Sequence, residues 1–209
     1  MLVVWERDYG SPVRTIFNPH PYGVLSLDMT PDGKYLCTMS APDERADKKE
    51  GEGTDSQEIR VWNWQDGSDA PLCSALVGNP DVQSCVRFNA WDPHELVTNG
   101  KRRVFFWTYD VDQPFQFYSP ALAARDFKQR VGDFTQTIFL PDSTQAATGT
   151  IDGDVVVWDL SLIVDGLSRP DERRAVKIIK LCPDLALNVL LVRQKVMVLW
   201  SSSCLRSKK

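Results

Sequence analysis

Short apolar runs that end in tryptophan recur along the chain. Their residues are mostly β-branched or aromatic, and no stretch of comparable length keeps a helical period, so the runs favour β-strands. The final tryptophans stand 57, 45, 51 and 42 residues apart. The runs are Leu2–Trp5, Ile59–Trp62, Val104–Trp107, Val155–Trp158 and Val196–Trp200.

A second pattern, a pair of strands joined by a Pro/Asp turn, precedes three of these runs. In the first unit, Val24–Met29 alternates, Thr30–Lys34 turns, and Tyr35–Met39 returns. Proline fixes φ and glycine accepts positive φ, so the sequence Pro-Asp-Gly reverses the chain at low cost. The same order of elements fills 85–98 and 136–148, and the tight turns Asn99-Gly100 and Asp152-Gly153 follow.

Because the whole strand–turn–strand unit repeats with the tryptophan, the period favours a β-propeller of the WD-repeat type. We therefore predict an all-β fold, a partial WD-repeat β-propeller that occupies residues 1–209 as a single incomplete domain. We expect about three full blades plus incomplete ones at each end. Lys177–Leu181 is expected to be the outer strand of the last, degraded unit.

The histidines do not follow the usual repeat. The Gly-His dipeptide typical of such units is missing. The two histidines of the sequence are His20, which lies between prolines, and His94, which lies in a turn. We expect both to be surface turn residues. The blades would then lack a buried hydrogen-bond network centred on histidine and would depend on apolar packing.

Two segments stand outside the repeat. Residues 42–58 are strongly charged, with no apolar residue larger than Ala46, so we expect a mobile surface loop inserted into the first unit. A solvated insertion is the favoured interpretation, and a docking segment is the alternative. Residues 201–209 form a serine-rich basic tail.

Composition limits the compartment and the partners. The net charge of −4 and the pI near 5.2 disfavour a nucleic-acid surface, which is normally basic. Five cysteines at wide spacings, with no C-x-x-C, favour a reducing compartment. The sequence shows no signal peptide and no apolar stretch of about 20 residues. We expect a soluble intracellular protein that binds neither nucleic acid nor membrane.

The residues that carry chemistry in enzymes are not arranged for catalysis. The motifs G-x-S-x-G and H-E-x-x-H and the P-loop are missing, and the two histidines lack orienting partners in the sequence. The acidic residues Asp43, Glu44 and Asp47 lack the spacing of a calcium loop and are expected to be solvated. We predict no enzyme, with no catalytic residue, no cofactor and no metal site.

Four residues are the candidates for a protein-binding surface. Trp64 and Trp91 fall just outside the predicted core strands, and large aromatic residues and arginine are favoured at interface hot spots. Arg102 and Arg103 lie in a tight turn, where they can meet an acidic surface such as that of tubulin. The competing interpretation makes the tryptophans blade caps and the arginines solvated side chains.

Some strings go beyond a generic repeat. Met29–Leu36 leads to Ile59–Trp64, then come Phe88-Asn89 and Asp92–Gly100, and later Phe127-Lys128 and Val131–Thr137. This succession resembles the WD-repeat region of cilia- and flagella-associated proteins, in particular the one of the calmodulin- and spoke-associated complex near the base of a radial spoke. The resemblance covers roughly residues 1 to 160 and fades after Ala175.

The resemblance implies a non-catalytic scaffold in the axoneme of the cilium or flagellum, with spoke components or tubulin as partners. Family members are longer and have two propellers, so we expect a fragment or a variant product. The EF-hand of some members is not matched, so calcium binding does not transfer. A general cytosolic WD-repeat adaptor of a multiprotein complex is the alternative. Because an open propeller leaves strand edges unpaired, we expect a partner or self-association to complete the ring.

Overall fold

The structure, a computed structural model, describes residues 1–42, 56–78, 81–110, 113–122, 130–141, 144–160 and 173–179. These residues form β-strands joined by turns, and none of them lies in a helix. The strands are β1 (Leu2–Trp5), β2 (Pro12–Ile16), β3 (Val24–Met29), β4 (Tyr35–Ser40), β5 (Ser56–Asn63), β6 (Cys73–Gly78), β7 (Cys85–Phe88), β8 (Glu95–Asn99), β9 (Val104–Asp110), β10 (Gln113–Tyr118), β11 (Phe134–Phe139), β12 (Gln145–Thr150), β13 (Val155–Leu160) and β14 (Arg173–Ile179).

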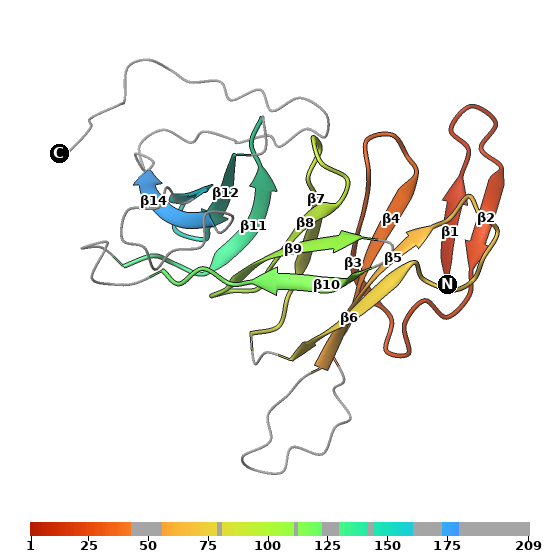
Figure 1. Ribbon diagram of the computed structural model, residues 1–209, viewed down its shortest axis with the longest axis horizontal. Helices are drawn as coiled ribbons and strands as arrows, with labels where there is room; N and C mark the ends of the chain where they lie inside the picture. Colours follow the sequence, from red (N-terminus) through yellow and green to blue (C-terminus); the bar gives the residue numbers. More distant parts are fainter. Residues whose placement is uncertain are drawn as a thin grey trace, which may run out of the picture.

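The strands make antiparallel sheets that follow one another along the chain. β3–β6, β7–β10 and β11–β14 are four-stranded sheets in chain order, here called blade 1, blade 2 and blade 3. β1 and β2 form a separate two-stranded sheet, here called the half-blade. Figure 1 shows the succession from the half-blade to blade 3. The first strands of the blades adjoin, because β3 contacts β7 and β7 contacts β11.

Successive four-stranded meanders that adjoin through their first strands are the arrangement of a β-propeller. The predicted fold class is therefore confirmed: the protein is all-β, a partial propeller with three full blades and an incomplete one at its N-terminal end. The incomplete blade expected at the other end lies outside the described residues, as does the basic tail at 201–209.

The prediction for Lys177–Leu181 was wrong. Lys177 belongs to β14, which pairs with β13 and is the fourth strand of blade 3. Outermost strands carry a weak apolar signature because much of their surface faces solvent, as the exposed residues Arg174 and Val176 illustrate. The sequence alone therefore did not show which unit this strand completes.

The predicted C-terminal bound of the loop at 42–58 was wrong, because a strand already begins at Ser56. Ser56–Asn63 is β5, the third strand of blade 1, and Gln57 is 1% exposed. A polar glutamine beside a charged segment suggests a loop in the sequence, but the Gln57 side chain is buried and hydrogen-bonded. Residues 43–55 lie outside the described part of the chain.

The apolar core lies between neighbouring blades. Trp62, Trp107 and Trp158 of the third strands are at most 2% exposed. Between blades 1 and 2 the buried cluster is Cys37, Met39, Ile59, Val61, Val77, Val86, Phe88, Leu96, Phe105, Trp107 and Tyr109. Between blades 2 and 3 it is Val97, Val104, Phe106, Phe134, Phe139, Ala146, Val156 and Trp158.

Polar side chains also fasten each blade to the next. On β3, the Ser26 hydroxyl accepts from the Val86 amide at 3.1 Å and the Asp28 carboxylate accepts from the Phe88 amide at 2.9 Å. Between blades 2 and 3, the Arg173 guanidinium forms a buried ion pair with Glu95. These bonds satisfy groups that burial between blades would otherwise leave unpaired.

Candidate protein-interaction surfaces

The four predicted binding residues divide between two ends of the blades. The Pro-Asp end carries the turns between first and second strands, such as 30–34 and 89–94. The arginine end carries the turns between second and third strands, such as 100–103. The two ends are separated by the length of β8, five residues or about 17 Å. Trp64 and Trp91 lie at the Pro-Asp end, and Arg102 and Arg103 lie at the arginine end.

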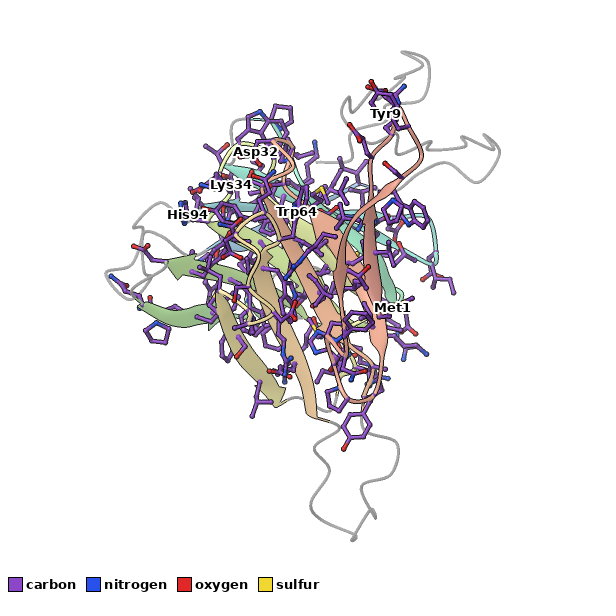
Figure 2. All side chains as sticks on the ribbon, turned by 90° about the vertical axis from the view of Figure 1, so that its right-hand side faces the viewer. Met1, Tyr9, Asp32, Lys34, Trp64 and His94 are labelled. Atoms are coloured by element: carbon purple, nitrogen blue, oxygen red, sulfur yellow. The ribbon has the colours of Figure 1, made fainter. Side chains whose placement is uncertain are left out.

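Trp64 is partly built into blade 1. It follows β5, packs against the cluster of Ile16, Leu36 and Trp62, and donates its indole N–H to the Gly33 carbonyl at 2.7 Å. Figure 2 labels Trp64 together with Asp32 and Lys34 of the adjoining turn. Its indole thus ties the turn 30–34 to the end of β5, while part of the side chain stays accessible.

Trp91 stands on a well-bonded turn and is 49% exposed. Its amide donates to the Asn89 side chain at 3.0 Å, and the Asn89 amide group donates to Glu95 at 2.7 Å. The Tyr109 hydroxyl donates to the Pro93 carbonyl at 2.6 Å. A large aromatic side chain is therefore presented to solvent on a fixed backbone, which lowers the entropy cost of an interface contact.

Arg102 and Arg103 are exposed on a turn held by one carboxylate. The Asp81 side chain accepts from the backbone amides of Lys101, Arg102 and Arg103 at 2.7 to 3.1 Å. The Phe134 amide also donates to the Lys101 carbonyl at 2.7 Å. Because the turn uses only backbone groups for these bonds, three cationic side chains remain directed to solvent.

A threonine–tryptophan hydrogen bond recurs inside all three blades. The indole N–H of Trp62 donates to Thr38 at 3.0 Å, that of Trp107 to Thr98 at 3.0 Å, and that of Trp158 to Thr148 at 2.7 Å. Each threonine is on the second strand and each tryptophan on the third. A further polar group reaches each hydroxyl: His20 in blade 1, Gln83 in blade 2 and Thr137 in blade 3.

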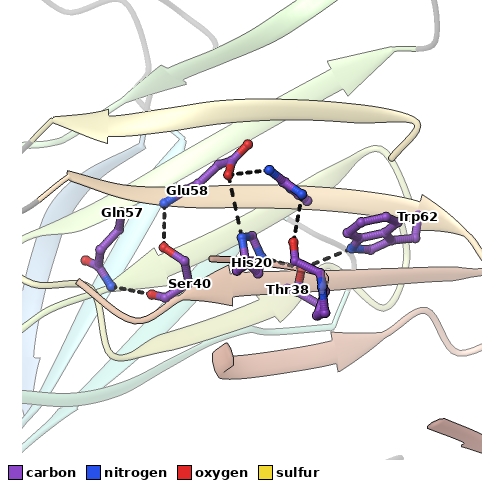
Figure 3. A network of polar contacts seen from close by, with 8 residues as sticks. His20, Thr38, Ser40, Gln57, Glu58 and Trp62 are labelled. Atoms are coloured by element: carbon purple, nitrogen blue, oxygen red, sulfur yellow. Dashed lines mark hydrogen bonds and ion pairs between the residues drawn. The ribbon is translucent and has the colours of Figure 1, made fainter. Parts of the chain in front are cut away.

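The expectation for His20 was therefore wrong. His20 is 4% exposed, and its Nε2 lies 2.8 Å from the Thr38 hydroxyl, as Figure 3 shows. The ring also lies 3.6 Å from the Glu58 carboxylate. Burial, reinforced by the positive charge of Arg60, lowers the pKa of His20 despite that carboxylate. The flanking prolines suggested an exposed turn, but the turn folds the ring inward; His94 is exposed in its turn as expected.

Two glutamines connect the networks of blades 1 and 2. The Gln57 side chain donates to the carbonyls of Ser40 and Gln83 at 2.9 Å and accepts from the Gln83 amide at 2.7 Å. Both glutamines are at most 1% exposed. Sequence reasoning missed these residues and the three threonines. One signal was present: Leu36-x-Thr38, Leu96-x-Thr98 and Ala146-x-Thr148 share the pattern of an apolar residue followed two positions later by threonine.

The thiols in the described region are poorly suited to nucleophilic chemistry. Burial raises the pKa of the Cys37 and Cys85 thiols and raises the pKa of Cys73 to about 12. The thiolate is the reactive form, so these groups stay protonated near neutral pH. Among the described residues, no three His, Cys, Asp or Glu side chains are grouped to hold a metal ion. The described part of the chain also contains no helix with the length and apolar character of a membrane span.

Three consecutive blades with the same internal hydrogen bond define a repeat protein of the β-propeller class. The chain belongs to the family described as CFAP251 N-terminal domain, which its residues 1–203 match. It is similar to cilia- and flagella-associated protein 251 of Chlamydomonas reinhardtii, with 44% identity over 88% of this chain and 23% of that protein. The protein of that name from Tetrahymena thermophila is 37% identical over 97% of this chain and 20% of its own length.

The chain thus spans about a fifth of the length of these two relatives. Among solved structures it is similar to a Myceliophthora thermophila Cps50 (Swd1) β-propeller domain, at 12% identity and a TM-score of 0.46, covering 85% of this chain and 64% of that one.

Proposed function

We propose that this chain is a non-catalytic protein-interaction scaffold of the cilium or flagellum, built on a WD-repeat β-propeller. The observation that carries the proposal is the family match over residues 1–203, with relatives whose names associate them with cilia and flagella. The repeated threonine–tryptophan bond supports the WD-repeat assignment, since it recurs in all three blades at corresponding strand positions.

Within the cilium we propose the axoneme, near the base of a radial spoke. The sequence resemblance described above supports this location. Spoke components or tubulin are the proposed partners. Tubulin-like acidic surfaces suit the arginine end, where Arg102 and Arg103 are exposed on a turn fixed by Asp81.

The Pro-Asp end supplies a second contact of different chemistry. Trp91 offers an exposed aromatic surface, and Trp64 adds a partly buried one at the same end. A scaffold needs at least two separate contacts to hold one component against another. The division of the four candidate residues between opposite ends fits that requirement.

The experiment is fractionation of ciliated cells that express the tagged chain. We expect salt-resistant retention in the axoneme. Release into the soluble fraction would favour the general cytosolic adaptor. The double variant Arg102→Glu/Arg103→Glu should lower retention, whereas Arg174→Glu/Lys177→Glu, with the same charge change on exposed positions of β14, should not. Equal behaviour of the two variants would remove the arginine end from the proposal. Trp64→Ala and Trp91→Ala test the other end in the same assay.

A further inference from the structure

The turn that carries Trp91 is closed by the side chains of Asn89 and Glu95. The Asn89 side-chain oxygen accepts from the Trp91 backbone amide at 3.0 Å, and the Asn89 side-chain amide donates to the Glu95 carboxylate at 2.7 Å. The Asn89 backbone amide also donates to the Glu95 carbonyl at 2.9 Å. Asn89 is fully buried although Trp91 is half exposed. A buried polar pair therefore fixes the backbone beneath an exposed aromatic side chain.

The Glu95 carboxylate is itself held from blade 3. The guanidinium of Arg173, the first residue of β14, donates to both carboxylate oxygens. The Glu95 Oε2 accepts from Asn89 at 2.7 Å and from Arg173 at 3.2 Å. The guanidinium is buried over the rings of Phe106 and Phe139. A continuous series of hydrogen bonds therefore runs from the outer strand of blade 3 to the Trp91 turn of blade 2.

The corresponding turns of blades 1 and 3 are closed within their own blades. The backbone bond across the turn recurs in all three blades, joining Asn89 to Glu95, Thr30 to Tyr35 and Leu140 to Gln145. At the Glu95 position of blade 3, Gln145 donates to Asp159 of the same blade at 2.8 Å. In blade 1, the Thr30 hydroxyl accepts from the Tyr35 amide at 3.0 Å. Among the described residues, the blade 2 turn is thus the one whose closing side chain forms an ion pair with another blade.

We propose that Arg173 and Glu95 are positioning residues for the Trp91 contact surface, so that partner binding at Trp91 depends on the docking of β14 against blade 2. Without Arg173, the Glu95 carboxylate loses its buried counter-ion, and Asn89 loses the fixed acceptor that orients it. Because coupling between two sites is reciprocal, a partner that immobilises the turn should also hold β14 more firmly. The inference rests on the proposed scaffold function and deepens it by naming the residues that control one of its contacts.

Hydrogen exchange of backbone amides, measured by NMR on the purified full chain, tests the coupling without a partner. Arg173→Met keeps an apolar stem between the two phenylalanine rings and removes the ion pair. We expect this variant to raise the exchange rate of the Trp91 amide by about tenfold, because the Asn89 acceptor is no longer held in place. The Lys34 amide, bonded to Asp32 at 3.0 Å in the blade 1 turn, should keep its rate.

Two further variants separate positioning from overall stability. Val156→Ala removes buried volume from the same cluster between blades 2 and 3 and leaves the bonded series intact. It should raise the exchange rates of Trp91 and of core amides such as Phe88 alike, whereas Arg173→Met should raise that of Trp91 selectively. Arg173→Lys, which keeps the charge, should have a smaller selective effect. An unchanged Trp91 rate in both Arg173 variants, or equal rises at Trp91 and Phe88, would overturn the proposal.

Retention in the axoneme connects the coupling to binding. Trp91→Ala and Arg173→Met should each lower the retention of the tagged chain, and the double variant should lose no more than the larger single loss, because both changes remove one contact. Additive losses would contradict the proposal. Unchanged retention in Trp91→Ala would remove Trp91 from the proposed function and with it the binding role inferred here. The exchange rates judge the coupling between Arg173 and the turn separately from that outcome.

Discussion

The half-blade and blade 3 share a local sequence and differ in what surrounds it. Both contain an apolar run closing on tryptophan, and both skip one residue of the fourth strand at that tryptophan. Trp158 is nevertheless 1% exposed and Trp5 is 60% exposed. The difference shows that burial of this tryptophan depends on the first two strands of the blade and on the adjacent blade. The motif itself supplies only the strand.

The attachments of the two regions differ in the same way. Blade 3 is fastened to blade 2 by the Arg173–Glu95 ion pair, whose side chains are 3% and 13% exposed and whose guanidinium lies over the rings of Phe106 and Phe139. The half-blade is fastened to blade 1 by Arg14, which donates to Asp69 at 2.7 Å, with that carboxylate 70% exposed. The ion pair of blade 3 is therefore buried, whereas that of the half-blade is largely exposed, and the buried contact of the half-blade is the packing of Ile16 against Leu36 and Trp62.

Truncation of the tryptophan should give the largest difference in stability loss between the two regions. Trp158→Ala should lower the free energy of unfolding by about 3–5 kcal/mol, because a buried aromatic side chain leaves a cavity. Trp5→Ala should change it by less than about 0.5 kcal/mol, as at other surface positions. Urea unfolding of both variants provides the measurement. Similar losses would show that Trp5 is covered in solution.

The ion pairs offer the next comparison. Glu95→Gln leaves the Arg173 charge buried without its partner and should cost about 3–5 kcal/mol. Asp69→Asn removes an exposed pair and should cost less than about 1 kcal/mol. Unfolding in urea at low and at about 0.5 M salt tests this, because salt screens the exposed pair far more than the buried one. A small loss in Glu95→Gln would mean that blades 2 and 3 separate easily.

The third-largest expected effect comes from removing the threonine–tryptophan hydrogen bond inside a blade. Thr148→Val keeps the volume of the side chain but leaves the Trp158 indole N–H buried without an acceptor, at a cost of about 1–3 kcal/mol. Thr108→Val, at an exposed position of β9, is the control and should lie within about 0.5 kcal/mol of the unaltered protein. If the two valine variants are equally stable, the recurring bond contributes nothing to the blades.

A pH dependence distinguishes blade 1 from its neighbours, since only its network contains a histidine. The pKa of His20 is lower in the folded chain than its ordinary value of about 6.5, so the unfolded chain binds the proton more tightly. His20 should therefore cost no stability above that value and should destabilise the fold as pH falls below it. His20→Gln introduces the side-chain type that Gln83 provides in blade 2, which does not titrate. This variant should therefore lose less stability than the unaltered protein between pH 7 and 5. Parallel stability curves for the two proteins would contradict the assignment.

The sequence was sufficient for most of the strand order because the turns that define it are local. Gly33 and Gly153 adopt φ of 72° and 82°, so these turns need glycine at those positions, and the sequence shows it. The internal networks could not be predicted in the same way. His20 and Thr38 stand 18 residues apart, and Arg173 and Glu95 stand 78 apart, so only the folded topology brings each pair together.

For the candidate site, too, the sequence predicted the local positions of the residues but not their arrangement in space. Each of Trp64, Trp91, Arg102 and Arg103 lies at a strand end or in a turn, as the sequence predicted. Their division between opposite ends follows from the direction of β8 and the pairing of β4 with β5. Strand direction within a sheet is a long-range property, so the sequence did not show that the four residues divide between two ends. Their role in binding stays a prediction.

The most direct test of the difference between the half-blade and the complete blades is hydrogen exchange of the tryptophan indoles, measured by NMR on the full chain at monomeric concentration. The account predicts slow exchange for Trp62, Trp107 and Trp158, whose indoles are buried and bonded to threonine, and fast exchange for Trp5. Slow exchange at all four indoles would contradict it, because β1 would then already have a second strand beside it.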